Sequence, residues 1–134
     1  MVVKSTLFSA VFLLTNSVTA LYKDDWIYML LFILLFCTSI SVRLVESDAI
    51  VAIDNICIFL IILYGGWLFL IKQPAMSWVF QLLIMATFLA TIYLYIYGYY
   101  TSSYSYDSDE ETSQLYHSLL HAISSVGHHI IVLS

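Results

Sequence analysis

All four histidines of the chain lie between residues 117 and 129, near its carboxyl end. His117 and His121 are separated by one helical turn, so on a helix their imidazole rings point to the same side. This spacing is the usual way in which a helix offers two ligands to one metal ion. Neutral imidazoles also form hydrogen bonds between membrane helices. The pattern therefore indicates either a metal site or a polar contact between helices.

Two further polar side chains lie in apolar surroundings. Asp54 lies within the string AIVAIDNICIFLIIL, and Ser39 belongs to a short polar cluster that ends at Arg43. An ionisable side chain at membrane depth is expensive and by default indicates function. The alternative for Asp54 is an ion pair with Arg43 near the membrane surface. Serines in membrane helices also often hydrogen-bond to their own backbone or pack against a neighbour.

The composition indicates which kind of element must position these side chains. Of the 134 residues, 62% are hydrophobic and only 10% are charged, whereas soluble domains carry about 25% charged residues. This balance excludes a small soluble domain. The four lysines and arginines are too few for a nucleic-acid-binding surface. We therefore predict an integral, multi-pass membrane protein whose partner is the lipid bilayer.

Hydrophobic segments divide the chain into predicted membrane spans. A helix needs about 20 apolar residues to cross a bilayer. Five segments approach this length within one predicted transmembrane domain, residues 1–134, and they are residues 2–22, 26–44, 49–71, 76–98 and 115–133. Residues 99–113 form a predicted acidic aqueous loop. Because backbone groups in lipid must bond within their own segment, the predicted fold class is an all-α, polytopic transmembrane bundle of about five spans.

The first segment has a second interpretation. Val18-Thr19-Ala20 is typical of a small-residue cleavage site, so residues 2–22 could also be a cleaved signal peptide. The orientation of the bundle stays open, because lysines and arginines are divided evenly between its two faces.

The order of the spans brings the polar side chains to one face of the membrane. If each segment from residue 26 onward crosses once, the end of the second, the start of the third and the start of the fifth lie at the same face. Ser39, Asp54, His117 and His121 lie near these three ends. We therefore predict one shared polar pocket that contains a hydroxyl group, a carboxylate and two imidazoles.

This set of residues resembles the pattern of the alkaline ceramidase, progestin/adipoQ receptor and hemolysin III superfamily of seven-helix membrane hydrolases. Members carry Ser-x-x-Tyr-His at the end of the second helix, an Asp at the start of the third, and His-x-x-x-His in the last helix. The corresponding strings here are Ser39-Ile40-Ser41-Val42-Arg43, Ile53-Asp54-Asn55 and His117-Ser118-Leu119-Leu120-His121. Asn16 stands where many members place an asparagine.

The resemblance implies a zinc-dependent hydrolase that acts on a lipid amide or ester. His117 and His121 would bind the zinc ion, which lowers the pKa of a bound water. Asp54 would orient or deprotonate that water, and Ser39 would stabilise the oxyanion of the substrate.

Two departures from the pattern change this expectation. The chain has room for five spans rather than seven, and Arg43 stands where members carry the third zinc ligand. Arginine stays protonated and does not bind metal ions. We therefore expect either a lipid hydrolase of this kind or a degenerate relative with reduced or no catalysis.

Two other functions remain open on the sequence alone. A non-catalytic multi-pass structural or interaction protein would use Arg43 and Asp54 as a buried ion pair and the histidines as helix contacts. An oligomeric proton or ion pathway would use the same serine, aspartate and histidine side chains along a polar route.

Overall fold

The computed structural model describes residues 9–134, and every regular element in this part of the chain is helical. The first eight residues, with which the first predicted span begins, lie outside the described part. The long helices are α2 (Val11–Tyr22), α3 (Trp26–Leu44), α4 (Asp48–Lys72), α5 (Trp78–Ile92) and α7 (Glu110–Leu133). The predicted all-α fold is thus confirmed for the described residues.

Short elements join or extend these helices. A 3₁₀ turn, η1 (Gln73–Ala75), follows α4 at the proline that stops it. Helix α5 continues through the π-helical η2 (Tyr93–Tyr97) into α6 (Gly98–Thr101). A second 3₁₀ turn, η3 (Tyr104–Tyr106), precedes α7.

Polar residues between the apolar runs fix where the helices start. The side chains of Asp25, Ser47, Ser77 and Asp109 accept hydrogen bonds from backbone N–H groups in the first turns of α3, α4, α5 and α7. Hydrogen bonds from Thr112 lower the pKa of Asp109 below its ordinary value. Helix α7 therefore starts within the acidic run, so residues 110–113 of the predicted loop are helical.

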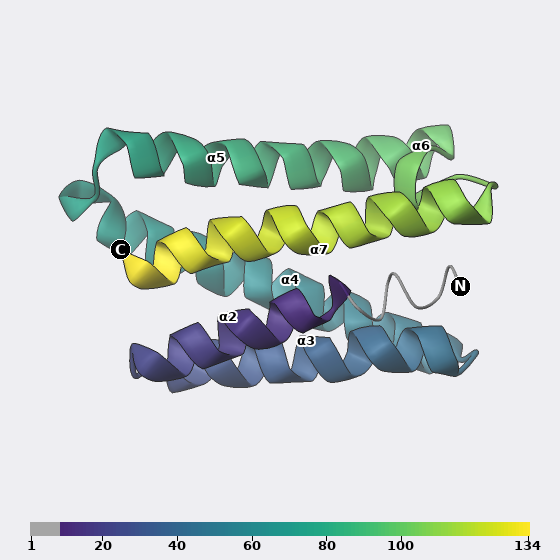
Figure 1. The fold of residues 1–134 in the computed structure, drawn as a ribbon, viewed down its shortest axis with the longest axis horizontal. Coiled ribbons are helices and arrows are strands. Elements are labelled where there is room, and N and C mark those ends of the chain that lie inside the picture. The colour runs from purple at the N-terminus through teal and green to yellow at the C-terminus, as the bar shows by residue number, and fades with distance from the viewer. Residues whose placement is uncertain (1–8) are drawn as a thin grey trace.

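The helices form two pairs, and α4 crosses behind them (Figure 1). Helices α2 and α3 lie side by side, as do α5 and α7, and α7 also contacts α2 and α4. Although α4 and α5 are consecutive, they are not among the helix pairs that pack closely. Helix α7 is thus the element that connects the two halves of the bundle.

Three helical stretches of the described chain are long and apolar enough to cross a membrane. They are Trp26–Leu44, Asp48–Ala75 and Trp78–Tyr106, while α2 is a shorter apolar helix. Large apolar side chains on the outside of these helices, such as Leu63, Trp67 and Leu89, are exposed. These features are consistent with an integral membrane protein, in which such side chains face lipid.

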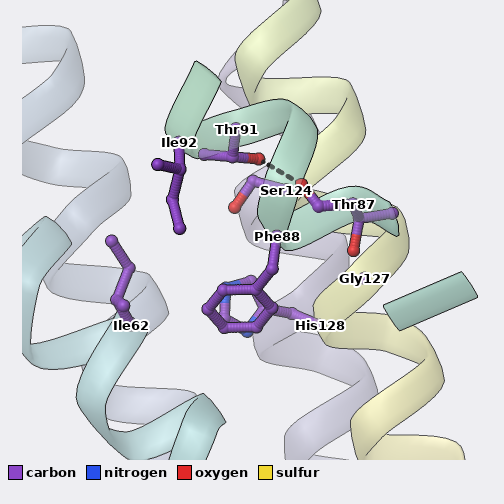
Figure 2. Close-up of a pocket in the computed structure, with 8 residues that line it drawn as sticks. All are labelled: Ile62, Thr87, Phe88, Thr91, Ile92, Ser124, Gly127 and His128. Carbon is purple, nitrogen blue, oxygen red and sulfur yellow. Dashed lines mark hydrogen bonds between the residues drawn. The ribbon is translucent and has the colours of Figure 1, made fainter. Parts of the chain in front are cut away.

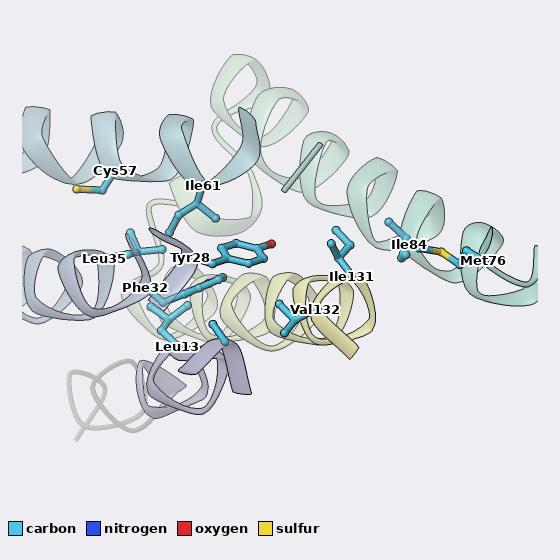
Figure 3. Packing of buried hydrophobic residues seen from close by; sticks show 11 residues of the cluster. Leu13, Tyr28, Phe32, Leu35, Cys57, Ile61, Met76, Ile84, Ile131 and Val132 are labelled. Carbon is cyan, nitrogen blue, oxygen red and sulfur yellow. The ribbon is translucent and has the colours of Figure 1, made fainter. Parts of the chain in front are cut away.

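The apolar core lies mainly between α2, α3, α4 and α7 and extends to Met76 and to Ile84 of α5 (Figure 3). Tyr28 and Phe32 of α3 are fully buried at its centre, with Leu13 of α2 and Ile61 of α4 packed around them. The Tyr28 hydroxyl group forms a hydrogen bond with Nδ1 of His128 on α7. This polar contact links α3 to α7 inside the core.

Gly65 provides the space in which α4 approaches this contact. A Cβ atom at Gly65 would lie 2.8 Å from Cε1 of His128 and 2.9 Å from the hydroxyl oxygen of Tyr28. At the neighbouring Gly66 no atom lies within 4 Å of the same position. Of these two neighbouring glycines, only Gly65 therefore requires the absence of a side chain.

We predict that Gly65→Ala destabilises the protein, whereas Gly66→Ala does not. The added methyl group at residue 65 overlaps the paired Tyr28 and His128 side chains, and such overpacking costs about 1–3 kcal/mol. Thermal unfolding in detergent micelles, followed by tryptophan fluorescence, measures the difference. An equal loss of stability in the two variants would contradict the packing at Gly65.

Candidate functional site

The four side chains selected from the sequence line one cavity of about 80 Å³ inside the bundle. Ser39 comes from α3, Asp54 from α4, and His117 and His121 from α7. The wall is completed mainly by apolar side chains, together with Thr91, Tyr95, Ser124 and His128. The predicted convergence of the four side chains is therefore found in the structure, while their chemical roles stay predictions.

Hydrogen bonds from α3 hold the Asp54 side chain. The Thr38 hydroxyl group donates to Oδ1 of Asp54 at 2.6 Å, and the Ser39 hydroxyl group lies 3.4 Å from the same oxygen. Asp54 and Ser39 are both buried. Thr38 is the stronger partner of Asp54, so the carboxylate and the Ser39 hydroxyl group share one small network at the cavity wall.

The two histidines lie next to each other at another part of the wall. The ring centroids of His117 and His121 are 4.6 Å apart, and the rings meet edge to face. Nδ1 of His121 forms a hydrogen bond of 2.9 Å with the hydroxyl group of Ser9, just before α2. The one-turn spacing thus places both imidazoles on the side of α7 that faces the cavity.

Arg43 lies in the last turn of α3, one helical turn beyond Ser39. Its charge is close enough to act on Asp54, His117 and His121. Within the described residues Arg43 and Asp54 form no ion pair, and the buried Nε atom of Arg43 has no hydrogen-bond partner. The ion pair considered for these two residues is therefore not formed in the described part of the chain.

The histidine side chains that could bind a metal ion at the candidate site are His117 and His121. Among residues 9–134, no group of three or more histidine, cysteine, aspartate or glutamate side chains could hold a metal ion. His128 and His129 belong to no such group either, and hydrogen bonds join Nδ1 of His128 to Tyr28 and Nε2 of His129 to Thr15. Zinc binding by His117 and His121 stays a prediction.

A second, smaller cavity of about 30 Å³ adjoins the first (Figure 2). It lies between α5 and α7, where Thr87 and Gly127 face each other, and the tilted rings of Phe88 and His128 have their centroids 6.2 Å apart. The two cavities share Ile62, Thr91, Ser124 and His128 as lining residues. Ser124 therefore stands at the boundary between them.

A wider apolar groove of about 400 Å³ runs between α4 and the continuous helix of α5 and η2. It shares Ile58, Ile62, Thr91 and Tyr95 with the polar cavity. The Tyr95 hydroxyl group donates to Oδ1 of Asn55 across this groove at 3.1 Å. Because α4 and α5 do not pack closely, the polar cavity adjoins a surface between two membrane-facing helices.

Sequence reasoning missed three of the residues around the site. Tyr95 belongs to a tyrosine-rich stretch that is typical of the membrane interface. The sequence therefore did not indicate that Tyr95 lines the cavity. Thr91 and Ser124 are common residues in membrane helices, and no spacing distinguishes them. Thr91 and Ser124 become part of one lining where α5 packs on α7.

Asn16 also contributes to the site, by fixing α7. Its fully buried side chain donates to the backbone carbonyl group of Ser125 at 3.1 Å and accepts from the Ser125 hydroxyl group at 2.6 Å. Ser125 lies one helical turn beyond His121. The pair therefore joins α2 to α7 directly beside the candidate site.

Comparison with protein-family models, with curated proteins and with solved structures found no match to this chain.

We predict that Ser125→Ala destabilises the bundle by about 1–3 kcal/mol, because it leaves the buried Oδ1 of Asn16 without its donor. Ser41→Ala is the matched control, since the Ser41 hydroxyl group bonds only to the backbone carbonyl group of Cys37 on its own helix. Thermal unfolding of both variants in detergent tests this difference. A loss in Ser41→Ala as large as that in Ser125→Ala would contradict the role of the Asn16 contact.

Proposed function

We propose that this protein is a shortened, ceramidase-like relative of the seven-helix membrane hydrolases that binds a lipid amide or ester. In this proposal five segments cross the membrane, and the polar cavity lies beneath the headgroups of one leaflet. Hydrolysis is reduced or absent, because the third zinc ligand of the superfamily is replaced by Arg43.

One observation carries the proposal. Ser39, Asp54, His117 and His121 come from three helices, of which α7 is distant in sequence from α3 and α4, and they line a single cavity. Polar side chains in a membrane bundle are expensive and are retained mostly where they pair or serve a function. A shared cavity is the arrangement expected if the residues that resemble the superfamily pattern act on the same ligand.

The surroundings of the cavity favour a lipid over a water-soluble ligand. The adjoining groove is lined largely by isoleucine, phenylalanine and tyrosine side chains and lies between helices with exposed apolar faces. A ligand with an apolar chain can occupy such a groove while its polar end reaches Ser39 and Asp54. The ligand would then enter from the bilayer and need not cross the headgroup layer.

The side chains at the cavity do not provide a complete catalytic zinc site. Such sites use three protein ligands and a water molecule. The described residues offer His117 and His121, and the neighbouring Arg43 guanidinium group repels a cation. Without a metal, the Thr38, Ser39 and Asp54 network can orient an amide or ester group by hydrogen bonds, which supports binding more strongly than cleavage.

The first experiment restores the missing ligand. We predict that purified wild-type protein carries zinc only at background level, whereas Arg43→His binds about one zinc ion per chain, as a three-ligand site requires. Adding His117→Ala or His121→Ala to Arg43→His should remove the metal. Zinc content is measured by mass spectrometry of the metal after purification in detergent.

Two results would contradict this part of the proposal. Wild-type protein with stoichiometric zinc that is lost in His117→Ala would show that Arg43 does not prevent metal binding. An Arg43→His variant that folds but binds no zinc would remove the structural link to the hydrolase superfamily.

The second experiment tests lipid binding at the cavity. Ser124→Phe places an aromatic ring at the boundary of the two cavities, whereas Val126→Phe adds the same ring to an exposed position of the same helix. We predict that a fluorescent fatty-acid amide binds Ser124→Phe about tenfold more weakly, a change of about 1.4 kcal/mol, and Val126→Phe unchanged. Equal binding by both folded variants would place the lipid elsewhere.

A non-catalytic structural membrane protein is the second candidate. It is favoured by the hydrogen bonds of His121, His128 and His129, all of which are made to other helices or their flanking residues. It predicts no saturable binding of the fluorescent amide by the wild-type protein, so the second experiment also separates the two candidates.

A further inference from the structure

Arg43 is the one cationic side chain of the described residues close to the candidate cavity. Lys23 and Lys72 lie at the opposite end of the bundle, in a hollow that they share with Asp25 and Tyr64. There Lys72 is already paired, because its ammonium group donates to the backbone carbonyl groups of the last turn of α7. Arg43 has no comparable partner among the residues that the structure describes.

The acidic side chain that acts on Arg43 from within the bundle bonds to other partners. Oδ1 of Asp54 accepts from Thr38 and lies within hydrogen-bond distance of Ser39. The histidines next to the guanidinium group carry no negative charge. Glu46 and Asp48, in the turn after α3, form no ion pair with Arg43 in the described structure.

An unpaired guanidinium group at this depth is an unfavourable arrangement for the protein alone. It presents five N–H donors, and a charged group near the bilayer is stabilised by pairing with an opposite charge. The helix dipole at the carboxyl end of α3 partly stabilises the positive charge of Arg43. It supplies no hydrogen-bond acceptor for the buried Nε atom. An anion beside Arg43 would satisfy both the charge and the donors.

We propose that Arg43, together with His117 and His121, binds an anionic headgroup, a carboxylate or a phosphate, that the single-chain lipid amide or ester carries. Guanidinium groups bind such planar or multi-oxygen anions through paired hydrogen bonds, and the imidazoles supply further hydrogen bonds. The chain of the lipid lies in the groove between α4 and α5. This assignment rests on the proposed lipid-binding function and names the class of lipid.

The placement of Arg43 favours a lipid over a free anion. The residue lies in the last turn of a helix that is long enough to cross the membrane, which is the depth of the lipid headgroups. Ser39, one turn deeper on the same helix, lines the cavity that adjoins the apolar groove. The cavity that Ser39 lines would thus lie between a headgroup at Arg43 and an apolar chain in the groove.

The test compares lipids that differ only in charge. Full-length protein in phosphatidylcholine nanodiscs is titrated with a fluorescent fatty acid, with the fatty alcohol of equal chain length, and with the matching alkyl phosphate. We expect the acid and the phosphate to bind the wild-type protein about tenfold to a hundredfold more tightly than the alcohol, as a hydrogen bond to a charged group implies.

Substitutions at Arg43 assign this preference to the guanidinium group. Arg43→Gln should lower the affinity for the acid and the phosphate to that for the alcohol, and Arg43→Lys should retain part of the preference. Lys23→Gln removes an exposed cation at the opposite end of the bundle and should leave all three lipids unaffected. Thermal unfolding of each variant establishes that it is folded, and Arg43→Lys preserves the charge if Arg43→Gln does not fold.

Three results would overturn the assignment. The first is equal binding of acid and alcohol by the wild-type protein, and the second is an equal loss of both lipids in Arg43→Gln. The third is competition by acetate or inorganic phosphate as strong as by the lipids, which would make the ligand a free anion. If the fluorescent amide still binds in these cases, the proposed function stands and only the headgroup assignment fails, whereas the absence of all lipid binding overturns both.

Discussion

Polar side chains inside this apolar bundle must find partners on neighbouring helices, and α7 provides most of them. Ser125 pairs with Asn16, and His128 pairs with Tyr28. His121 and His129 reach polar groups at or before α2. Because lipid is as apolar as the side chains around it, hydrophobic burial alone does not fix how membrane helices pack. These hydrogen bonds specify the rotation of α7 and therefore the side that its histidines present to the cavity.

The choice of helix partners also explains why the candidate site lies beside the apolar groove between α4 and α5. Helix α5 has a single buried residue in its regular part, Ile84, and meets the bundle mainly through α7. Helix α4 instead packs on α3, through a face that includes Asp54 and Gly65. The two helices therefore leave an apolar groove between them, and its inner side joins the polar cavity. The groove that we propose for a lipid chain is thus next to the cavity that contains the polar side chains.

The positive charge of Arg43 changes the kind of ligand that the two histidines favour. Two imidazoles beside a neutral third ligand would favour a metal ion, whereas two imidazoles beside a guanidinium group favour an anion. The carboxylate of Asp54 does not neutralise this charge by an ion pair in the described structure, because its hydrogen bonds come from Thr38 and Ser39. One substitution relative to the superfamily pattern therefore changes both the metal and the ligand that we propose.

The sequence by itself determined the helices and the end of the bundle at which the polar residues gather. Residues 26–44 were predicted as a span and form α3, and residues 49–71 lie within α4, because capping residues and Pro74 separate long apolar runs. The partners of Asp54 and the place of Tyr95 were decided only by the tertiary structure. Helices α3 and α4 are apolar on nearly every side, so no periodicity shows which face is buried. That choice depends on close helix contacts and interhelical hydrogen bonds, which exist only once the helices have packed.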